Sequence, residues 1–290
     1  MTAQVAIVTG ASSGIGAAVA RRLNAAGHIV YAVARRVELM ASLAEDGIVP
    51  VRLDVTDDAA LTALVARVIA EHGRIDVLVN NAGYGALGAI EDVALAEARR
   101  QFDVNLFGLA RLTQLVLPHM RANRSGRIIN MSSMGGKVHV PLGGWYHATK
   151  FAVEGFSDAL RLEVAPFGIQ VIVIEPGAIN TEWHSVAADN LVVTSVGGAY
   201  TDLAAAVAKI LAAGGLGSSP EVIAKAVGRA VHARRPRSRY AVGRGAKPIL
   251  LARLVLPDKV FDRTARLVVR VGSRVVGAPA VRKISAGRAS

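Results

Sequence analysis

The segment "VTGASSGIGAAVA" (residues 8–20) joins a short apolar run to a helical pattern through a turn that holds three glycines. Gly10, Gly14 and Gly16 let the backbone turn tightly and come close to a bound group. The helix that follows presents free N–H groups and the positive end of its dipole at the same place. A glycine-rich turn also occurs without any ligand. Its position after the first strand of a strand–helix–strand unit favours a nucleotide pyrophosphate over that alternative.

Short apolar runs alternate with longer helical patterns on both sides of this turn. Most of the runs are nearly all apolar and β-branched, which is typical of strands buried on both faces of a parallel sheet. We expect strands at residues 5–10, 29–35, 48–55, 75–83, 127–133, 169–177 and 238–243, and helices at 15–26, 57–72, 95–121 and 150–166. The alternation predicts an α/β fold, a single Rossmann-type doubly wound parallel sheet of about seven strands with helices on both faces.

The composition of the 290-residue chain is that of a folded protein, with 52% hydrophobic and 19% charged residues. Cysteine is absent, which excludes a disulfide framework and favours a cytoplasmic location. The start "MTAQVAIVTG" lacks a basic region followed by a long apolar run, so no signal peptide is expected. No apolar stretch of about 20 residues predicts a spanning helix. The seven histidines show no ligand spacing, so no metal site is expected.

The net charge of +12 is concentrated at the C-terminal end of the chain. Residues 231–290 contain 15 Lys and Arg and only two acidic residues, Asp258 and Asp262. The first 230 residues are nearly neutral, with 19 basic and 20 acidic residues. Tyr240 and Phe261 are the only aromatic residues of the basic segment. Because few aromatic side chains are available to stack on bases, nucleic acid is not expected as a partner.

A basic amphipathic helix is predicted over residues 258–274. Its basic positions are Lys259, Arg263, Arg266, Arg270 and Arg274, and the apolar positions, mostly on the other side, are Val260, Phe261, Leu267, Val268 and Val271. Three roles stay open for it: a peripheral membrane contact with anionic headgroups, an arm packed on a neighbouring subunit, and a cover over a substrate site. A fourth is a helix folded back on the protein's own sheet with a solvated basic face.

Four further motifs follow the glycine turn in a fixed order. "NNAG" (80–83) ends the fourth predicted strand, and "DVNLFG" (103–108) lies on the next long helix. "YHATK" (146–150) places a tyrosine one helical turn before a lysine, and "PGAINT" (176–181) ends the sixth strand. Together with the glycine turn, these motifs resemble the short-chain dehydrogenase/reductase family over roughly residues 4–185.

The resemblance implies four catalytic residues, which are Asn105, Ser133, Tyr146 and Lys150. Ser133 stands at the family's usual spacing before the tyrosine, and Ser132 should face away because successive strand side chains alternate. A carbonyl that accepts a hydride needs a proton, and Tyr146 is the expected general acid/base. The Lys150 ammonium should lower the tyrosine pKa from about 10 and hold the nicotinamide ribose. Ser133 would bond the substrate oxygen, and Asn105 would hold a water that relays protons.

The residues after the second predicted strand indicate the form of the nicotinamide cofactor. "YAVARR" has Ala34 where an acid would bond the ribose 2′-OH of NAD, followed by Arg35 and Arg36. Two guanidinium groups suit a 2′-phosphate, so NADP(H) is expected, although Arg36 alone could be a solvated surface charge. Asp54 is expected to contact the adenine, with capping of the next helix as the alternative. The expected cofactor-binding residues are Gly10, Ser12, Ser13, Gly14, Ile15, Gly16, Arg35, Arg36, Asp54, Val55, Asn81, Ala82, Gly83, Tyr146, Lys150, Pro176, Gly177, Ile179 and Thr181.

The function implied by the resemblance is NADP(H)-dependent interconversion of an alcohol and a ketone or aldehyde. Residues 1–245 would form the catalytic domain, with a variable substrate loop at about 182–217, and residues 246–290 a basic amphipathic extension. The expected substrate-pocket residues are Met134, Leu142, Trp145 and Trp183, with packing in the core as the alternative. Trp183, Leu191 and several valines of the substrate loop favour an apolar substrate such as a steroid, retinoid, acyl or aryl ketone. By analogy with the family, long helices would pair into a homodimer or homotetramer.

Two other functions are open to a chain with this pattern. A catalytically silent nucleotide-binding regulator usually lacks part of the Ser–Tyr–Lys set, which is intact here. A sugar-nucleotide epimerase or dehydratase shares the Tyr-x-x-x-Lys motif, but its glycine turn is spaced differently and its substrate domain is larger. Two neighbours of the motif are expected to be structural, His147 as a packing residue and Glu154 as a solvated or capping charge.

Overall fold

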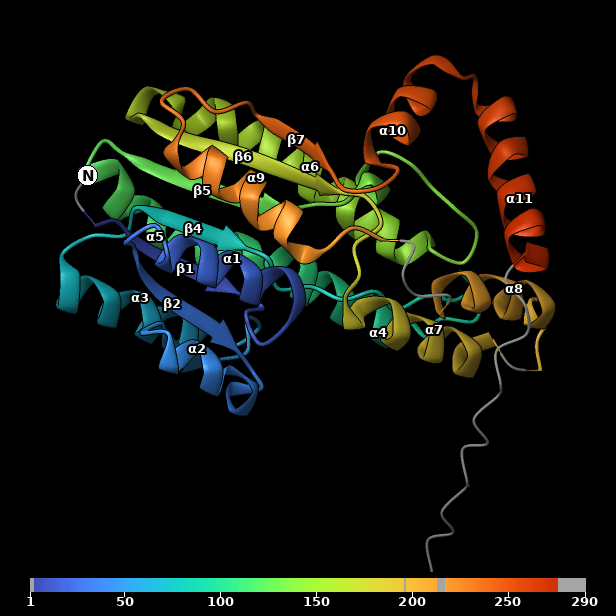
Figure 1. The fold of residues 1–290 in the computed structure, drawn as a ribbon, viewed down its shortest axis with the longest axis horizontal. Helices are drawn as coiled ribbons and strands as arrows, with labels where there is room; N and C mark the ends of the chain where they lie inside the picture. The colour runs from blue at the N-terminus through green and yellow to red at the C-terminus, as the bar shows by residue number, and fades with distance from the viewer. Residues whose placement is uncertain (1–2, 196, 213–216, 276–290) are drawn as a thin grey trace, which may run out of the picture.

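A sheet of seven parallel strands runs through the centre of the computed structural model, which describes residues 3–195, 197–212 and 217–275 (Figure 1). The strands are β1 (Val5–Thr9), β2 (Ile29–Ala34), β3 (Val49–Arg52), β4 (Val77–Asn80), β5 (Gly126–Met131), β6 (Ile169–Pro176) and β7 (Arg239–Val242). Their spatial order is β3-β2-β1-β4-β5-β6-β7. The predicted doubly wound sheet is therefore confirmed, and its order reverses between β1 and β4, where such sheets bind ligands at their carboxyl edge.

Helices cover both faces of the sheet because its strands are apolar on both sides. One face carries α1 (Gly14–Asn24), α2 (Ala41–Glu45) and α9 (Pro220–His232), and the other carries α3 (Asp58–His72), α5 (Gly108–Ala122) and α6 (Gly144–Val164).

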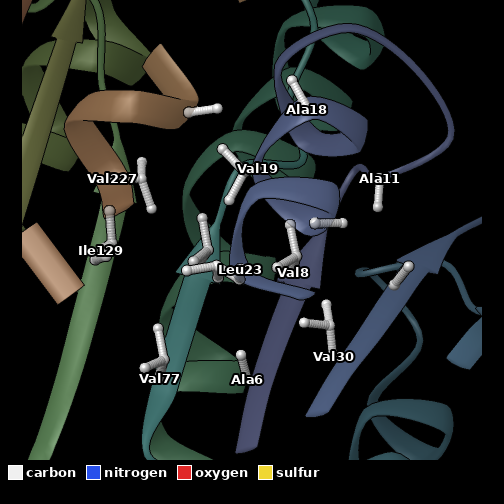
Figure 2. Packing of buried hydrophobic residues seen from close by; sticks show 14 of the residues in the cluster. Ala6, Val8, Ala11, Ala18, Val19, Leu23, Val30, Val77, Ile129 and Val227 are labelled. Carbon is white, nitrogen blue, oxygen red and sulfur yellow. The ribbon is translucent and has the colours of Figure 1, made fainter. Parts of the chain in front are cut away.

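Neighbouring residues of one strand enter opposite cores. Val8 packs in the core under α1 and α9, which also contains Leu23 and Val227 (Figure 2). Ile7 lies in the core under α3, α5 and α6, and both Ile7 and Val8 are fully buried. Burial of each such side chain stabilises the fold by about 1.5–3 kcal/mol. The strand pattern read from the sequence thus has its physical cause in two cores that share one sheet.

The helix predicted over residues 95–121 is interrupted where Asn105 lies. It consists of α4 (Leu95–Phe102), a π-helical turn (Asp103–Phe107) and α5. The Asn105 side-chain amide donates to the Tyr84 carbonyl oxygen at 2.9 Å and to the Thr149 hydroxyl at 3.0 Å, and its oxygen accepts from the Tyr84 N–H at 3.0 Å. These three bonds hold the wider turn, a kind of irregularity that often marks a functional site.

Other predicted boundaries also differ from the structure. The helix expected over residues 150–166 begins at Gly144, so α6 contains both Tyr146 and Lys150. The expected substrate loop at about 182–217 contains α7 (Glu182–Ser195) and α8 (Thr201–Ala212). Residues 196 and 213–216 of this loop lie outside the described residues. The described residues also form short 3-10 turns at Val37–Met40, Met134–Gly136 and Ala165–Phe167.

The C-terminal extension forms a helical hairpin of α10 (Ala246–Val255) and α11 (Asp258–Val275) beyond the carboxyl edge of the sheet (Figure 1). The predicted basic helix is therefore present, and residues 276–290 lie outside the described residues. The alternative of a helix folded back on the sheet is wrong, because α11 packs mainly against α8. Among the described residues, no helix combines the length and apolar character needed to cross a membrane.

Candidate active site

The glycine turn after β1 is held by close backbone contacts. Gly10 has a φ of +66°, and a Cβ there would lie 2.8 Å from the Cα of Ala82. A Cβ at Gly16 would overlap the carbonyl oxygen of Gly10, so no side chain fits. The side chain of Ser13 makes no capping hydrogen bond to α1. The first N–H groups of α1 are consequently available to an anion such as a pyrophosphate.

The "NNAG" segment fixes this turn from the neighbouring strand. The Asn81 side-chain amide donates to the carbonyl oxygens of Thr9 at 2.9 Å and Gly10 at 3.2 Å. The Thr9 hydroxyl accepts from the N–H groups of Asn81 and Ala82, each at 3.0 Å. Asn81 and Ala82, expected to bind the cofactor, therefore have a positioning role visible in the structure. The positioning role of Thr9 was missed, although the residue belongs to the glycine motif.

A cleft of about 560 Å³ opens beside the glycine turn. Ser12, Ser13 and Gly14 line it from the turn, and Thr181 and Glu182 line it from the start of α7. Four of these five residues are among those expected to bind the cofactor.

The remaining expected cofactor residues near this cleft are mainly packed into the protein. Gly177 follows β6, and a Cβ there would overlap the carbonyl oxygen of Arg244. Pro176 and Ile179 are buried, and Ile179 joins the same core as the partly buried Ile15. These residues therefore pack at the carboxyl edge of the sheet.

The two arginines after β2 extend into solvent beside the glycine turn. The Arg35 side chain is 65% exposed and its Nη1 lies 3.8 Å from the carboxylate of Asp54. Arg36 is 54% exposed and its Nη2 lies 3.6 Å from the carboxylate of Glu182. Exposed pairs at these distances are weak, so both guanidinium groups remain suited to binding a phosphate.

The two residues expected to contact the adenine follow β3. The Asp54 carboxylate accepts from the N–H and the hydroxyl of Thr56 at 3.0 and 2.9 Å. The alternative role of Asp54 as the cap of the next helix is wrong, because Asp57 caps α3 by accepting from Ala60. Val55 is buried against the first residue of α5, Gly108.

Ser133, Tyr146 and Lys150 meet after the carboxyl end of β5. Ser133 caps the 3-10 turn Met134–Gly136 by accepting from the Gly135 N–H at 3.0 Å, and a side-chain hydrogen bond joins it to Tyr146. The Lys150 ammonium donates to the Met131 carbonyl oxygen at 2.9 Å and lies 5.9 Å from the centre of the Tyr146 ring. Ser132 is buried apart from this group, with its hydroxyl near Gly136.

Asn105 reaches this group through two neighbours. Its amide donates to Thr149, the residue before Lys150. A Cβ at Gly83 would lie 3.0 Å from the Asn105 side-chain oxygen and 3.6 Å from the Lys150 ammonium nitrogen. Gly83 thus allows the "NNAG" loop to pass close to both side chains, and the four expected catalytic residues lie in one region.

The pKa values in this region are set mainly by burial. Burial raises the pKa of Tyr146, and the hydrogen bond with Ser133 partly opposes this. Burial lowers the pKa of Lys150 to about 8, while the Glu154 carboxylate acts in the other direction. The expected lowering of the tyrosine pKa by Lys150 is not seen, because burial is the largest influence on this pKa and raises it. Tyr146 is therefore a protonated phenol near neutrality, the form that can donate a proton.

The buried ammonium of Lys150 gives a testable dependence of stability on pH. Its pKa is about 8 in the folded chain and ordinarily 10.5, so the unfolded chain binds more protons between these values. The free energy of unfolding should therefore rise with pH in this window, by up to about 1.4 kcal/mol per pH unit. Urea unfolding at several pH values should show the rise in the native chain and its absence in Lys150→Met. Equal slopes for the two proteins would contradict it.

One of the four expected substrate-pocket residues, Trp183, lies directly against the tyrosine. The Trp183 ring centre is 5.2 Å from that of Tyr146, and Gly85 leaves room for the indole. Leu142, with a φ of +65°, belongs to a small apolar cluster with residues of α7 and α8, against which Tyr146 and Trp183 pack. Met134 and Trp145 are half-buried and are not part of this cluster.

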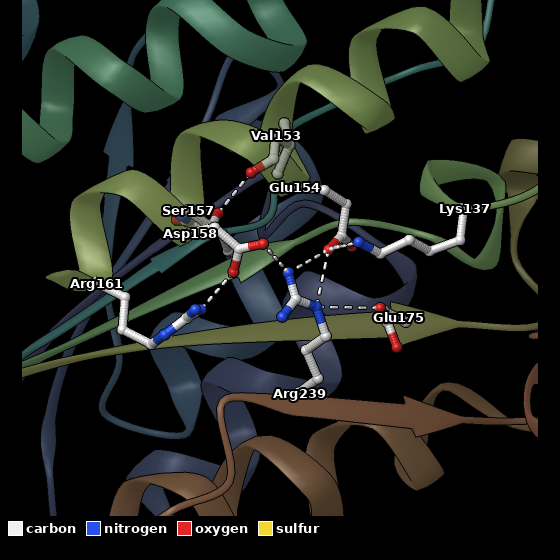
Figure 3. A network of polar contacts seen from close by, with 9 residues as sticks. Lys137, Val153, Glu154, Ser157, Asp158, Arg161, Glu175 and Arg239 are labelled. Atoms are coloured by element: carbon white, nitrogen blue, oxygen red, sulfur yellow. Dashed lines mark hydrogen bonds and ion pairs between the residues drawn. The ribbon is translucent and has the colours of Figure 1, made fainter. Parts of the chain in front are cut away.

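A buried charge network lies one turn further along α6 (Figure 3). Glu154 is 3% exposed, so the expectation of a solvated charge was wrong. Its carboxylate accepts from Arg239 at 3.0 Å and lies 3.2 Å from the Lys137 ammonium. Arg239 also binds Asp158 at 2.7 Å and lies 3.5 Å from Glu175. Burial, together with the nearby Glu154 carboxylate, raises the pKa of Glu175 to about 6. The network ties α6 to β6 and β7.

The chain matches known proteins over most of its length. A family model described as "short chain dehydrogenase" matches residues 4–191. A "3-ketodihydrosphingosine reductase" of Bacteroides thetaiotaomicron is 45% identical over 62% of this chain and 66% of that protein, slightly less than two thirds of its length. An "NADPH-dependent 3-dehydrocapnine reductase" of Ornithobacterium rhinotracheale is 33% identical over 89% of this chain and 94% of that protein.

The fold is also similar to that of a solved structure. This is a metagenomic short-chain oxidoreductase in complex with NADP, which is 31% identical in sequence and superposes with a TM-score of 0.66. The match covers 82% of this chain and 96% of that chain.

Proposed function

The chain belongs to the short-chain dehydrogenase family, and from this premise we propose that it is an NADP(H)-dependent oxidoreductase that interconverts an alcohol and a ketone or aldehyde. The observation that carries the proposal is the meeting of Ser133, Tyr146 and Lys150 beside the glycine turn. The turn has open N–H groups for a pyrophosphate, and a hydroxyl, a phenol and an ammonium lie at the same edge of the sheet.

Each polar group has one role in this reaction. The nicotinamide cofactor, when bound, supplies or accepts the hydride. Ser133 donates a hydrogen bond to the substrate oxygen, and Tyr146 donates its phenolic proton to that oxygen as it becomes an alkoxide. Lys150 holds a positive charge next to the phenolate that remains, and Asn105 positions the helix turn and the loop behind it. In alcohol oxidation the proton moves in the opposite direction.

NADP(H) is the proposed cofactor because of the groups at the end of β2. Ala34 leaves no carboxylate to repel a 2′-phosphate, and the guanidinium groups of Arg35 and Arg36 are exposed. Arg36 lies 3.6 Å from Glu182, which lines the same cleft as the serines of the glycine turn. An NADPH-dependent relative and an NADP-bound structure support the same choice.

The arginine pair gives a prediction about cofactor preference. Replacing both residues, Arg35→Ser with Arg36→Ser, should lower kcat/KM for NADPH on the order of 100-fold, because two charge-assisted hydrogen bonds to the phosphate are lost. Turnover with NADH should change little. Steady-state kinetics with both cofactors checks this, with Arg99→Ser on the exposed side of α4 as the control. An equal loss with NADPH and NADH would contradict the assignment.

The proposed substrate is apolar because the surroundings of Tyr146 are apolar. The Trp183 ring lies against that of Tyr146, and Leu142 belongs to the apolar cluster with residues of α7 and α8 against which both pack. Relatives named as reductases of 3-ketodihydrosphingosine and 3-dehydrocapnine support a keto substrate.

The proposed function is tested by oxidation of NADPH and NADH by the purified protein across a panel of apolar ketones and aldehydes. We expect turnover with NADPH and at least one apolar ketone. Binding of NADPH without turnover in a broad panel would instead favour the silent regulator. The cytoplasmic location and the homodimer or homotetramer stay predictions, and light scattering of the full chain measures the subunit number.

A further inference from the structure

The helix α11 carries a row of apolar side chains that the described structure covers only in part. Val260, Leu267, Val268 and Val271 are exposed by 40%, 59%, 66% and 48%. Their spacing of seven, one and three residues places them on one side of the helix. In α10, Leu254 and Val255 are 82% and 65% exposed immediately before the connection to α11. The hairpin thus exposes a group of neighbouring apolar side chains, a feature that marks interaction sites on protein surfaces.

A row of basic side chains runs beside the apolar row. Lys259, Arg263, Arg266 and Arg270 are all exposed, and three of them directly precede an apolar residue of the first row. The two rows therefore lie next to each other along the whole helix. The row consisting of Val260, Leu267, Val268 and Val271, together with these four cations, is called the α11 surface below.

Contacts on the side of α11 next to the apolar row fix its orientation, since Phe261 lies seven residues before Val268 and shares its side of the helix. Phe261 is 7% exposed and packs between Arg253, 5.5 Å from its ring centre, and the His139 ring at 5.4 Å. The two acidic residues of the helix pair with cations of the protein, Asp258 with Arg253 at 2.8 Å and Asp262 with His139 at 2.9 Å, although their side chains are 77% and 45% exposed. Most of the α11 surface therefore points away from these contacts, and it contains no acidic residue.

We propose that the α11 surface binds an anionic phospholipid bilayer. Apolar side chains along one edge can enter the acyl boundary while the adjacent cations contact the lipid phosphates, which is the pattern of an interfacial helix. The chain beyond α11 adds three more basic residues and no acidic one over residues 276–290, so the local charge favours an anionic surface. An antiparallel pair of copies joined through the same row would bring the two basic rows together, which is repulsive.

The position of α11 gives this contact a consequence for substrate access. α11 packs against α8, and α8 belongs to the apolar cluster against which Tyr146 and Trp183 pack. A bilayer at the α11 surface would therefore lie close to a helix of the apolar cluster at the proposed site. This consequence rests on the proposed function, whereas the lipid contact itself does not.

The test is co-sedimentation of the full-length chain with vesicles, which needs no turnover. The chain should bind vesicles of phosphatidylglycerol mixed with phosphatidylcholine, bind pure phosphatidylcholine much more weakly, and lose affinity as salt is raised. Arg263→Gln with Arg266→Gln should weaken binding by about fivefold for each cation removed. Leu267→Gln with Val271→Gln should weaken binding on the order of tenfold or more. The matched control is Leu95→Gln, an equally exposed leucine on α4, which should bind like the native chain.

Two results would overturn the proposal. One is no binding to the phosphatidylglycerol vesicles, and the other is unchanged binding after the Leu267 and Val271 substitutions in a chain whose circular dichroism is native. A change of subunit number in that variant, without any vesicle binding by the native chain, would identify the α11 surface as a contact between copies. NADPH turnover is measured separately, so a chain that fails to reduce ketones but binds vesicles refutes only the proposed function.

Discussion

Tyr146→Phe is expected to lower kcat for ketone reduction by a factor between about a hundred and ten thousand, the usual range for loss of a general acid. The phenol is the group joined to Ser133, and its raised pKa keeps it protonated near neutrality. Phenylalanine keeps the ring contact with Trp183, whose centre is 5.2 Å away, and removes only the proton donor. The apolar packing around the site should therefore survive while the chemical step fails.

The measurement is steady-state kinetics together with an NADPH titration followed by fluorescence. NADPH affinity should stay within a few-fold of that of the native chain, which separates loss of chemistry from loss of folding. Tyr84→Phe is the matched control, because its hydroxyl binds Glu97 at 2.8 Å while its backbone holds Asn105. The acid/base assignment is wrong if Tyr146→Phe keeps most of the native kcat.

Arg239→Met is expected to lower the free energy of unfolding by about 3–5 kcal/mol, the typical cost of removing one partner from a buried ionic network. Arg239 is the shared partner of Glu154, Asp158 and Glu175 (Figure 3). Without it, Glu154 keeps only Lys137 for one carboxylate oxygen, and the other oxygen already has no partner in the described structure. The buried carboxylates of Glu154 and Glu175 would then lie close together with little positive charge to neutralise them.

The pH dependence of this loss has a definite sign. The pKa of Glu175 is raised to about 6 from its ordinary 4.5, so the folded chain binds the extra proton between these values and loses stability as pH rises through them. Removing Arg239 removes a cation that lowers this pKa, so protonation should relieve part of the damage. Urea unfolding should show a smaller effect of Arg239→Met in mild acid than above neutrality.

The control for this prediction lies two residues away. Arg237 is exposed and outside the network, and Arg237→Met should change the free energy of unfolding by less than about 0.5 kcal/mol. A similar small effect for Arg239→Met would show that solvent screens the network more than its burial indicates.

The elements that could be predicted from the sequence are those with a local physical cause. Val8 and its neighbours alternate between two cores, and this requirement leaves a run of apolar, β-branched residues that is recognisable without the structure. Gly10 is required by its positive φ, and Gly16 is required because a Cβ there would overlap the carbonyl oxygen of Gly10. Tyr146 and Lys150 stand one helical turn apart whatever surrounds them. These signals are short-range, so the sequence alone determined the sheet, the glycine turn and the residues expected at the site.

Other features depend on partners that are distant in the chain, and only the tertiary structure decided them. Glu154 is buried because Arg239, 85 residues away, neutralises it from β7. The helix interruption at Asn105 depends on Thr149, 44 residues away. The direction of α11 depends on α8 and on His139, 123 residues from Asp262. A local pattern shows that a side chain is charged or that a helix is amphipathic. Long-range packing decides which charged side chains are buried and which apolar side chains stay exposed to solvent.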